Sequence, residues 1–199
     1  MKSDRRVLTY TLSILVNKSA TLVVLGAGLV MTGHAVLTPL LQALSMIAGD
    51  FVTMSRAADR VRPSPHPNRW RVRNLTLAAI PLGLFKLCYC VSVLAVAWFF
   101  LRLNSGEMQT LTLAMLVFAG QATVYVLREQ GPMWSSRPAS IMLFASSADI
   151  AILALLAVRG VLMTPLAPAV VAALFIATLA FAFALDCVKL AIVARLPID

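Results

Sequence analysis

The chain has 199 residues, of which 60% are hydrophobic and only 13% are charged, and its mean hydropathy is +0.89. A soluble domain carries about 25% charged residues, so this composition predicts an integral membrane protein. The net charge of +9 falls in blocks between apolar runs and not on one basic face. That distribution argues against a nucleic-acid-binding surface and is typical of topology signals.

Six apolar runs reach the length of roughly 20 residues that a membrane-spanning helix requires. In chain order they cover residues 8–32, 35–54, 75–101, 109–127, 140–158 and 168–194. The runs are too long, and alternate too little, to be the strands of a membrane barrel. The sequence therefore predicts an all-α integral membrane protein, a bundle of six transmembrane helices.

The first two runs are separated only by "TGHA", and Pro39 falls in the first turns of the second run. We therefore expect a tight transmembrane hairpin within residues 1–54, which carries the candidate ion site. The first run does not have the features of a signal peptide. Asn17 and Lys18 interrupt it, and no clean cleavage site follows it.

A basic, proline-rich segment at 55–74 separates this hairpin from the runs within 75–199, which we expect to form a supporting four-helix bundle. If the N-terminus is cytoplasmic, twelve of the 17 basic residues lie on that side, and only Arg102 and Arg159 lie on the other. This asymmetry predicts that both termini are cytoplasmic. The basic segment is then a cytoplasmic loop, either a topology anchor that attracts anionic lipid headgroups or a docking site.

Asp50 lies near the end of the second run, where a carboxylate is costly unless it has a function or a partner. Gly49 before it would permit local unwinding that exposes backbone groups as ion ligands. Spacing alone leaves two readings of Asp50, a transport acid or a residue that marks the end of the helix. Lys18 is either an interior cation with Asp50 as its nearest acid or a residue near the membrane surface.

The other interior polar residues favour structural roles. Lys86 and Asp149 lie mid-span in the third and fifth runs, where they could pair with each other or with backbone carbonyls. Asp186 and Lys189 are three residues apart, so we expect a local ion pair. Interhelical hydrogen bonding is the expected role of Gln42, Gln121, Ser146 and Ser147. The candidate supporting residues of the ion site are Gly49, Gln42, Lys86 and Asp149.

We expect no metal site and no cofactor in this chain. Cys88 and Cys90 are two residues apart, so on a helix their thiols point about 200° apart and do not chelate one ion. His34 and His66 fall in loops on opposite sides of the membrane. The sequence also lacks a phosphate-binding glycine loop, a nucleophile with an adjacent base, and an HExxH motif.

Several stretches give the chain a resemblance to a known family. They are "RRVLTYTLSILVNK" at 5–18, "GDFVTMSRAADRVRPSPHPNRW" at 49–70, "REQGPMWSSRPAS" at 128–140 and "FALDCVKLAIVARL" at 183–196. In this order they resemble the fifth to tenth transmembrane helices of P-type cation-transporting ATPases. The likeness is greatest to the plasma-membrane proton-pump branch.

The resemblance implies roles for three residues. Asp50 falls at the acid that accepts and releases the transported proton in proton pumps. Gly49 stands where those pumps have Asn, so the hydrogen-bonding neighbour of the acid is missing. Lys18 lies near the built-in cation of the fifth helix, which would favour re-ionisation of Asp50 and oppose return of the proton. Asp50 is the only acid in the first two runs, which favours H⁺ over calcium or magnesium.

The motifs DKTGT, TGES and GDGxND, with which P-type pumps handle ATP, do not occur in the 199 residues. We therefore expect no ATP hydrolysis by this chain alone. Four functions stay open: half of a split pump, a truncated and idle product, a repurposed regulator or scaffold, and an independent proton leak. The first implies a complementary chain that carries the ATP-handling domains and the first four helices. It also implies a location in the plasma or inner membrane.

Overall fold

A computed structural model describes Lys18 and residues 20–57, 72–128, 131–135 and 138–195. This part of the chain is helical and contains no strand, which confirms the predicted all-α class. The helices are Ala20–Thr32, here called the first helix, then α2 (Pro39–Ala57), α3 (Val72–Phe99), α4 (Ser105–Leu127), α5 (Ser140–Arg159) and α6 (Pro168–Arg195). The start of the first predicted run, and most of the basic segment with His66, lie outside the described residues.

Among the described residues, four helices are long and apolar enough to cross a membrane, and they correspond to the last four of the six predicted runs. Their candidate spans are Ile80–Phe99, Ser105–Leu127, Ser140–Arg159 and Pro168–Ile192. α4 begins four residues before the predicted run because polar residues form its first turn. The Asn104 side chain accepts from the Glu107 amide at 2.9 Å, and the Glu107 carboxylate accepts from the Asn104 amide at 2.9 Å. This reciprocal capping satisfies two amides at the helix start.

The connection between the first helix and α2 is short because residues at both of its ends favour a helix boundary. Gly33 has a φ of 68°, and its amide donates to the Leu29 carbonyl at 2.9 Å, which is a typical end of a helix. The Thr38 hydroxyl accepts from the Leu41 amide at 3.3 Å, and Pro39 takes the first helical position. The break at "TGHA" is therefore as the sequence predicted.

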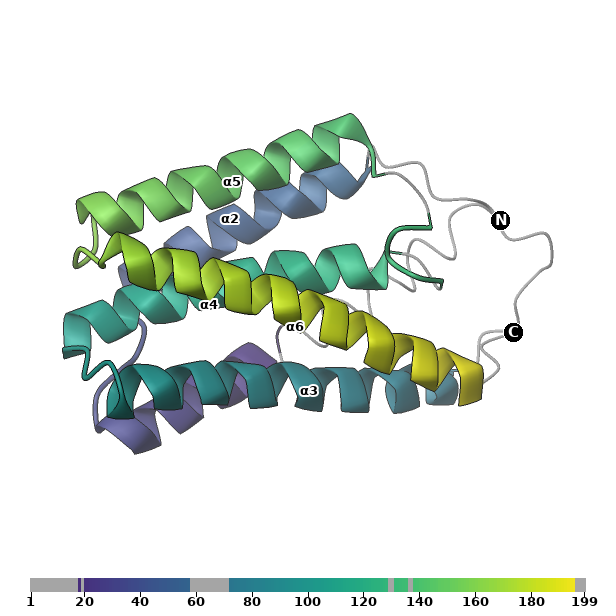
Figure 1. Cartoon of the computed structure of the whole chain (residues 1–199), viewed down its shortest axis with the longest axis horizontal. Helices are drawn as coiled ribbons and strands as arrows, with labels where there is room; N and C mark the ends of the chain where they lie inside the picture. The colour runs from purple at the N-terminus through teal and green to yellow at the C-terminus, as the bar shows by residue number, and fades with distance from the viewer. Residues whose placement is uncertain (1–17, 19, 58–71, 129–130, 136–137, 196–199) are drawn as a thin grey trace.

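The two helices that this connection joins do not pack as the hairpin that we expected. Figure 1 shows them leaving residues 33–38 toward opposite edges of the bundle, with consecutive helices along the chain running in opposite directions. α2 packs against α4 and α5. Six residues can span about 20 Å when extended, so a short connection does not force the helices it joins into contact.

The centre of the bundle is α4, which packs against α2, α3, α5 and α6. Its candidate span is 89% buried inside the protein, whereas the other three candidate spans are 22–33% buried. The hydroxyls of Thr112 and Thr123 bond to carbonyls one turn earlier, at 2.7 Å each, so these polar groups need no partner on another helix. A helix surrounded by protein can carry such residues, and α4 does so along its length.

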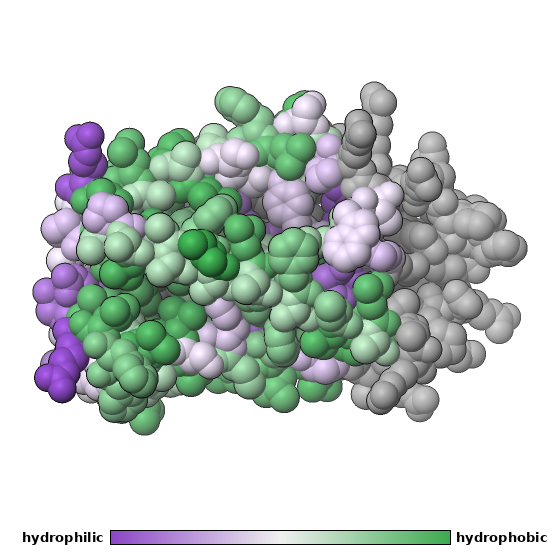
Figure 2. Space-filling model, in the orientation of Figure 1, coloured by the Kyte–Doolittle hydropathy of each residue, from purple (hydrophilic) through white to green (hydrophobic). Residues whose placement is uncertain are grey.

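The surface that surrounds this core is apolar. Figure 2 shows a broad hydrophobic face, with strongly hydrophilic residues gathered at one end of the described part. Large apolar side chains point outward, among them Leu22 (71% exposed), Phe100 (82%) and Phe144 (78%). Such a surface suits a lipid environment, in which helices satisfy their own backbone groups. The chain is a multi-pass membrane protein by helix length and surface character.

Candidate functional site

Asp50 lies on the outward face of α2. The face turned to the bundle carries Leu41 (3% exposed) and Ala48 (8% exposed). The opposite face carries Met46 and Ile47, which are 51% and 54% exposed, together with the exposed Asp50. Residues four apart lie on one side of a helix, so Met46 and Asp50 are neighbours. Asp50 is thus an exposed acid within an apolar helix surface.

Gly49 does not interrupt α2, so the local unwinding that it would permit is not used there. The helix continues without a break from Pro39 to Ala57, through Gly49 and Asp50. A Cβ atom added at Gly49 would meet no atom within 4 Å, so no close approach requires glycine there. Since the backbone groups around Asp50 are used in helical hydrogen bonds, they are not exposed as ion ligands.

Lys18 is helical and exposed, next to the start of the first helix. Within the described part of the chain it forms no ion pair with Asp50, and Figure 1 shows their helices diverging. Gln42 is also apart from the acid, because it lies eight residues earlier on α2, about 12 Å along a helix. The amide oxygen of Gln42 is buried and has no hydrogen-bond partner among the described residues. The structure does not bring Lys18, Gln42 and Asp50 together.

Lys86 and Asp149 are not the pair that the sequence allowed. Lys86 is 1% exposed in α3, one turn before the buried Cys90. Asp149 instead accepts a hydrogen bond from the side-chain amide of Gln121 on α4. α3 and α5 are not among the helix pairs that pack together. Lys86 and Asp149 therefore belong to different interfaces of the bundle.

The α4–α5 interface carries a line of polar contacts. Besides Gln121 and Asp149, the hydroxyls of Tyr125 and Ser146 are 2.5 Å apart, and the Tyr125 hydroxyl donates to the Met142 carbonyl at 3.2 Å. The predicted interhelical role is confirmed for Gln121 and Ser146. Ser147 is exposed and bonds to its own helix, at the Leu143 carbonyl, so that prediction was wrong for Ser147.

A second polar cluster joins α6 to the end of α4. Lys189 and Asp186 form the predicted ion pair, with 2.6 Å between Nζ and Oδ1, and both are buried. The Lys189 ammonium also donates to the carbonyls of Val126 at 2.9 Å and Gly131 at 2.7 Å. Asp186 accepts from the Met133 amide at 3.2 Å. We did not predict these contacts with the end of α4 from the sequence, although a lysine beside the last carbonyls of a helix is a recognisable signal.

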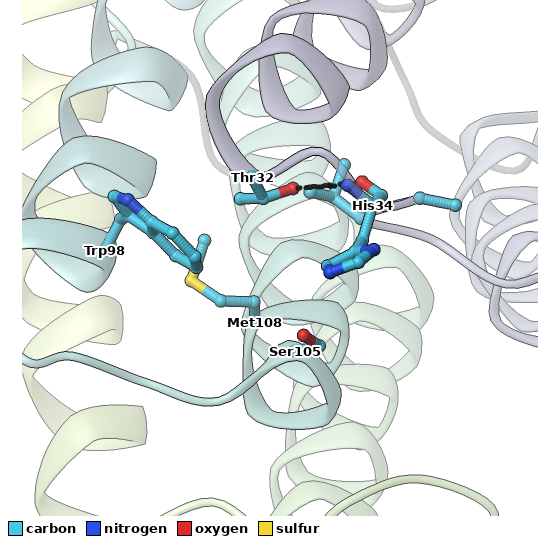
Figure 3. A pocket seen from close by; sticks show the side chains of 7 residues that line it. Thr32, His34, Trp98, Ser105 and Met108 are labelled. Carbon is cyan, nitrogen blue, oxygen red and sulfur yellow. Dashed lines mark hydrogen bonds between the residues drawn. The ribbon is translucent and has the colours of Figure 1, made fainter.

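The cysteines and histidines behave as separate residues. Cys88 is exposed and Cys90 is buried, as their predicted orientation on opposite faces of a helix requires, and all three thiols are free. His34 lies beside a small cavity of about 10 Å³, which has room for about one water molecule. Figure 3 shows that the Met108 side chain points toward Trp98 there, and that the His34 amide bonds to the Thr32 hydroxyl. The cavity is too small for a ligand.

Similarity to one curated protein connects this helical arrangement with transport. The chain is 29% identical, over 166 residues, to a protein of Methanocaldococcus jannaschii that is named as an assumed cation-transporting ATPase. The match covers 82% of this chain but only 20% of the relative, so the chain spans about a fifth of the relative's length. No family model matches the chain. Together with the apolar helices, this similarity supports a membrane part like that of a P-type cation-transporting ATPase.

Proposed function

We propose that the chain is the transport portion of a P-type cation pump, equivalent to the fifth to tenth transmembrane helices, and that it moves protons when combined with ATP-handling domains. The observation that carries this proposal is the position of Asp50. It is twelfth of the 19 residues of α2, and it lies on the outward apolar face. A carboxylate on a face turned to lipid is costly, so a face that carries one is suited to be covered by further helices.

The composition of that face favours a proton over a divalent ion. Calcium takes six to eight oxygen ligands, and magnesium takes six in an octahedron. Among the side chains on α2 that the structure describes, the exposed neighbours of Asp50 are Met46 and Ile47, and they supply no further oxygen ligand. A single carboxylate is enough to bind and release one proton. Lys18, which the resemblance places near Asp50, does not contact it among the described residues, so any positive charge that drives proton release would act from another position or from added helices.

The ATP-binding, phosphorylation and actuator functions are then supplied outside these 199 residues, by a complementary chain that also brings the first four helices. The similarity to a relative of which the match covers only 20% supports this division. The complex would lie in the plasma or inner membrane with both termini of this chain in the cytoplasm, as the distribution of arginine favours. The lipid bilayer, the complementary chain and H⁺ are its proposed partners.

The test is to co-express the chain with a candidate complementary chain and to measure ATP-driven acidification of membrane vesicles. We expect acidification with the wild type and its loss with Asp50→Ala. A matched control is Ser92→Ala, an exposed polar residue on α3 whose hydroxyl bonds only to its own helix, at the Cys88 carbonyl. Full pumping by Asp50→Ala would overturn the proposed role of Asp50.

One observation favours an alternative, a six-helix regulator or scaffold without transport activity. Gly49 replaces the amide neighbour that the resemblance leads us to expect, and α2 stays helical through the site. In this case the outward face of α2 would bind another membrane protein without moving a cation. Co-purification with a membrane protein, combined with no ATP-driven acidification in any pairing, would favour this alternative.

A further inference from the structure

The hydrogen bond between Gln121 of α4 and Asp149 of α5 leaves one polar atom unsatisfied. Gln121 is 5% exposed, and its Nε2 donates to Oδ2 of Asp149. Its amide oxygen Oε1 is buried and has no hydrogen-bond partner in the part of the chain that the structure describes. A buried acceptor without a donor is destabilising. The pair is therefore incomplete while Asp149 is an ionised carboxylate, which can only accept.

Protonation of Asp149 would supply the donor that Oε1 of Gln121 lacks. A carboxylic acid carries one O–H donor and keeps an acceptor oxygen. Facing a primary amide, it forms two parallel hydrogen bonds, from N–H to the carboxyl oxygen and from O–H to the amide oxygen. We infer that Asp149 binds a proton and holds it, as a neutral carboxylic acid, between its own carboxyl group and Oε1 of Gln121.

The depth of Asp149 supports the neutral form. It is tenth of the 20 residues of α5, and its helix is a candidate membrane span, so it lies near mid-span. An ionised aspartate at that depth is costly unless it is paired with a cation. Binding one proton removes the charge, and the amide of Gln121 then satisfies both oxygens of the acid.

No described cation performs this neutralisation. Among the described residues, no titratable side chain on α5 or on the helices packed against it forms an ion pair with Asp149. Asp50 is exposed on α2, and on α4 Glu107 caps the helix start, Tyr125 bonds to Ser146 and Arg128 follows the helix end. On α6 Asp186 pairs with Lys189 and Cys187 is exposed, and Arg159 lies in the last turn of α5. The neighbour that interacts with Asp149 is the neutral Gln121.

This site is separate from Asp50 and does not depend on ATP-driven pumping. The test uses the full chain in lipid nanodiscs, with aspartate labelled by ¹³C at the side-chain carboxyl. Infrared spectra in light and heavy water then report protonated aspartic acid. At neutral pH we expect a labelled C=O band that shifts on deuteration, and we expect Asp149→Asn to remove it. Gln121→Leu should move the band to higher frequency, because the C=O group loses its hydrogen-bond donor.

Two controls separate this result from other effects. Asp50→Asn and Ser147→Ala should leave the Asp149 band in place, since Ser147 is exposed and bonds only within α5. An unchanged labelled band in Asp149→Asn would overturn the inference. If that variant does not fold, as judged by circular dichroism and gel filtration, Asp149→Glu moves the acid and removes its label, and a persistent band overturns the inference equally. Absence of ATP-driven acidification would count against the proposed function alone.

Discussion

Asp50 on α2 and Asp186 on α6 are both aspartates in apolar helices, but their surroundings are opposite. Asp186 is 1% exposed, lies 2.6 Å from the Lys189 ammonium, and accepts the Met133 amide. Asp50 is exposed and has neither a hydrogen bond nor an ion pair within the described residues. The charge of Asp186 is therefore neutralised inside the chain, which makes it structural. The charge of Asp50 has no such partner among the described residues.

The difference follows from what each helix has beside it. Lys189 is one turn after Asp186 on the same helix, and its ammonium also reaches the carbonyls of Val126 and Gly131. These contacts join α6 to the end of α4 and to the segment after it. On α2 the residue one turn before Asp50 is Met46, which supplies no charge and no donor. The ion pair of Asp186 is thus supplied by its own helix, whereas the described side chains of α2 supply none for Asp50.

Breaking the paired region should have the largest effect on stability. Lys189→Ala leaves Asp186 buried without its cation and leaves two carbonyls without their donor. Removal of one member of a buried ion pair costs about 3–5 kcal/mol, so we expect a loss of that size in the free energy of unfolding. Unfolding of the purified chain in mixed detergent micelles, followed by circular dichroism, measures it.

The double variant Asp186→Asn, Lys189→Met separates the loss of the ion pair from the cost of leaving one buried charge unpaired. It should lose clearly less stability than Lys189→Ala, because no uncompensated charge remains. Cys187→Ala, an exposed position on the same helix, should stay within about 0.5 kcal/mol of the wild type. Equal losses in the single and double variants would show that Asp186 is not the group that Lys189 stabilises.

Removing the Asp50 carboxylate should raise stability instead of lowering it. Asp50→Leu removes from the apolar face of α2 an acid that has no ion pair among the described residues, and insertion scales assign about 2.5–3.5 kcal/mol to Asp at the centre of a membrane helix. We therefore expect the isolated chain to gain stability and to insert more efficiently, although the variant is unable to bind a proton at this position. Glycosylation-tagged insertion of α2 into microsomes, compared with Met46→Leu as a control, measures the gain. A loss of stability would show that Asp50 already has a partner within the chain.

The sequence predicted the helices better than their neighbours. Long apolar runs and their basic flanks predicted an all-α membrane bundle, and the Gly33 and Pro39 boundary was visible as a break between runs. The i,i+3 spacing of Asp186 and Lys189 was enough to predict their ion pair, because one helix fixes both positions. Local geometry decides such features, so they can be read without knowing which helices touch.

Contacts between helices could not be predicted in the same way. Lys86 and Asp149 were both expected mid-span, yet their helices do not pack together, and the partner of Asp149 is Gln121. The expected hairpin failed for a related reason, since a six-residue connection permits the first helix and α2 to separate. The role of Asp50 in transport stays a prediction, because no contact of Asp50 within the described residues tests it.

Loss of an uncharged polar contact should change stability least, and its effect is the reference against which Asp186 and Asp50 are compared. Tyr125→Phe removes the hydroxyl that lies 2.5 Å from Ser146 and also bonds to the Met142 carbonyl, but it keeps the ring. Interhelical hydrogen bonds in membrane proteins contribute about 0.6 kcal/mol on average, so we expect a loss of about that size in the same detergent unfolding experiment. Ser147→Ala is the matched control, because the Ser147 hydroxyl bonds only within α5. If Tyr125→Phe costs as much as Lys189→Ala, then charge is not what distinguishes the paired region, and the contrast between Asp186 and Asp50 must rest on packing instead.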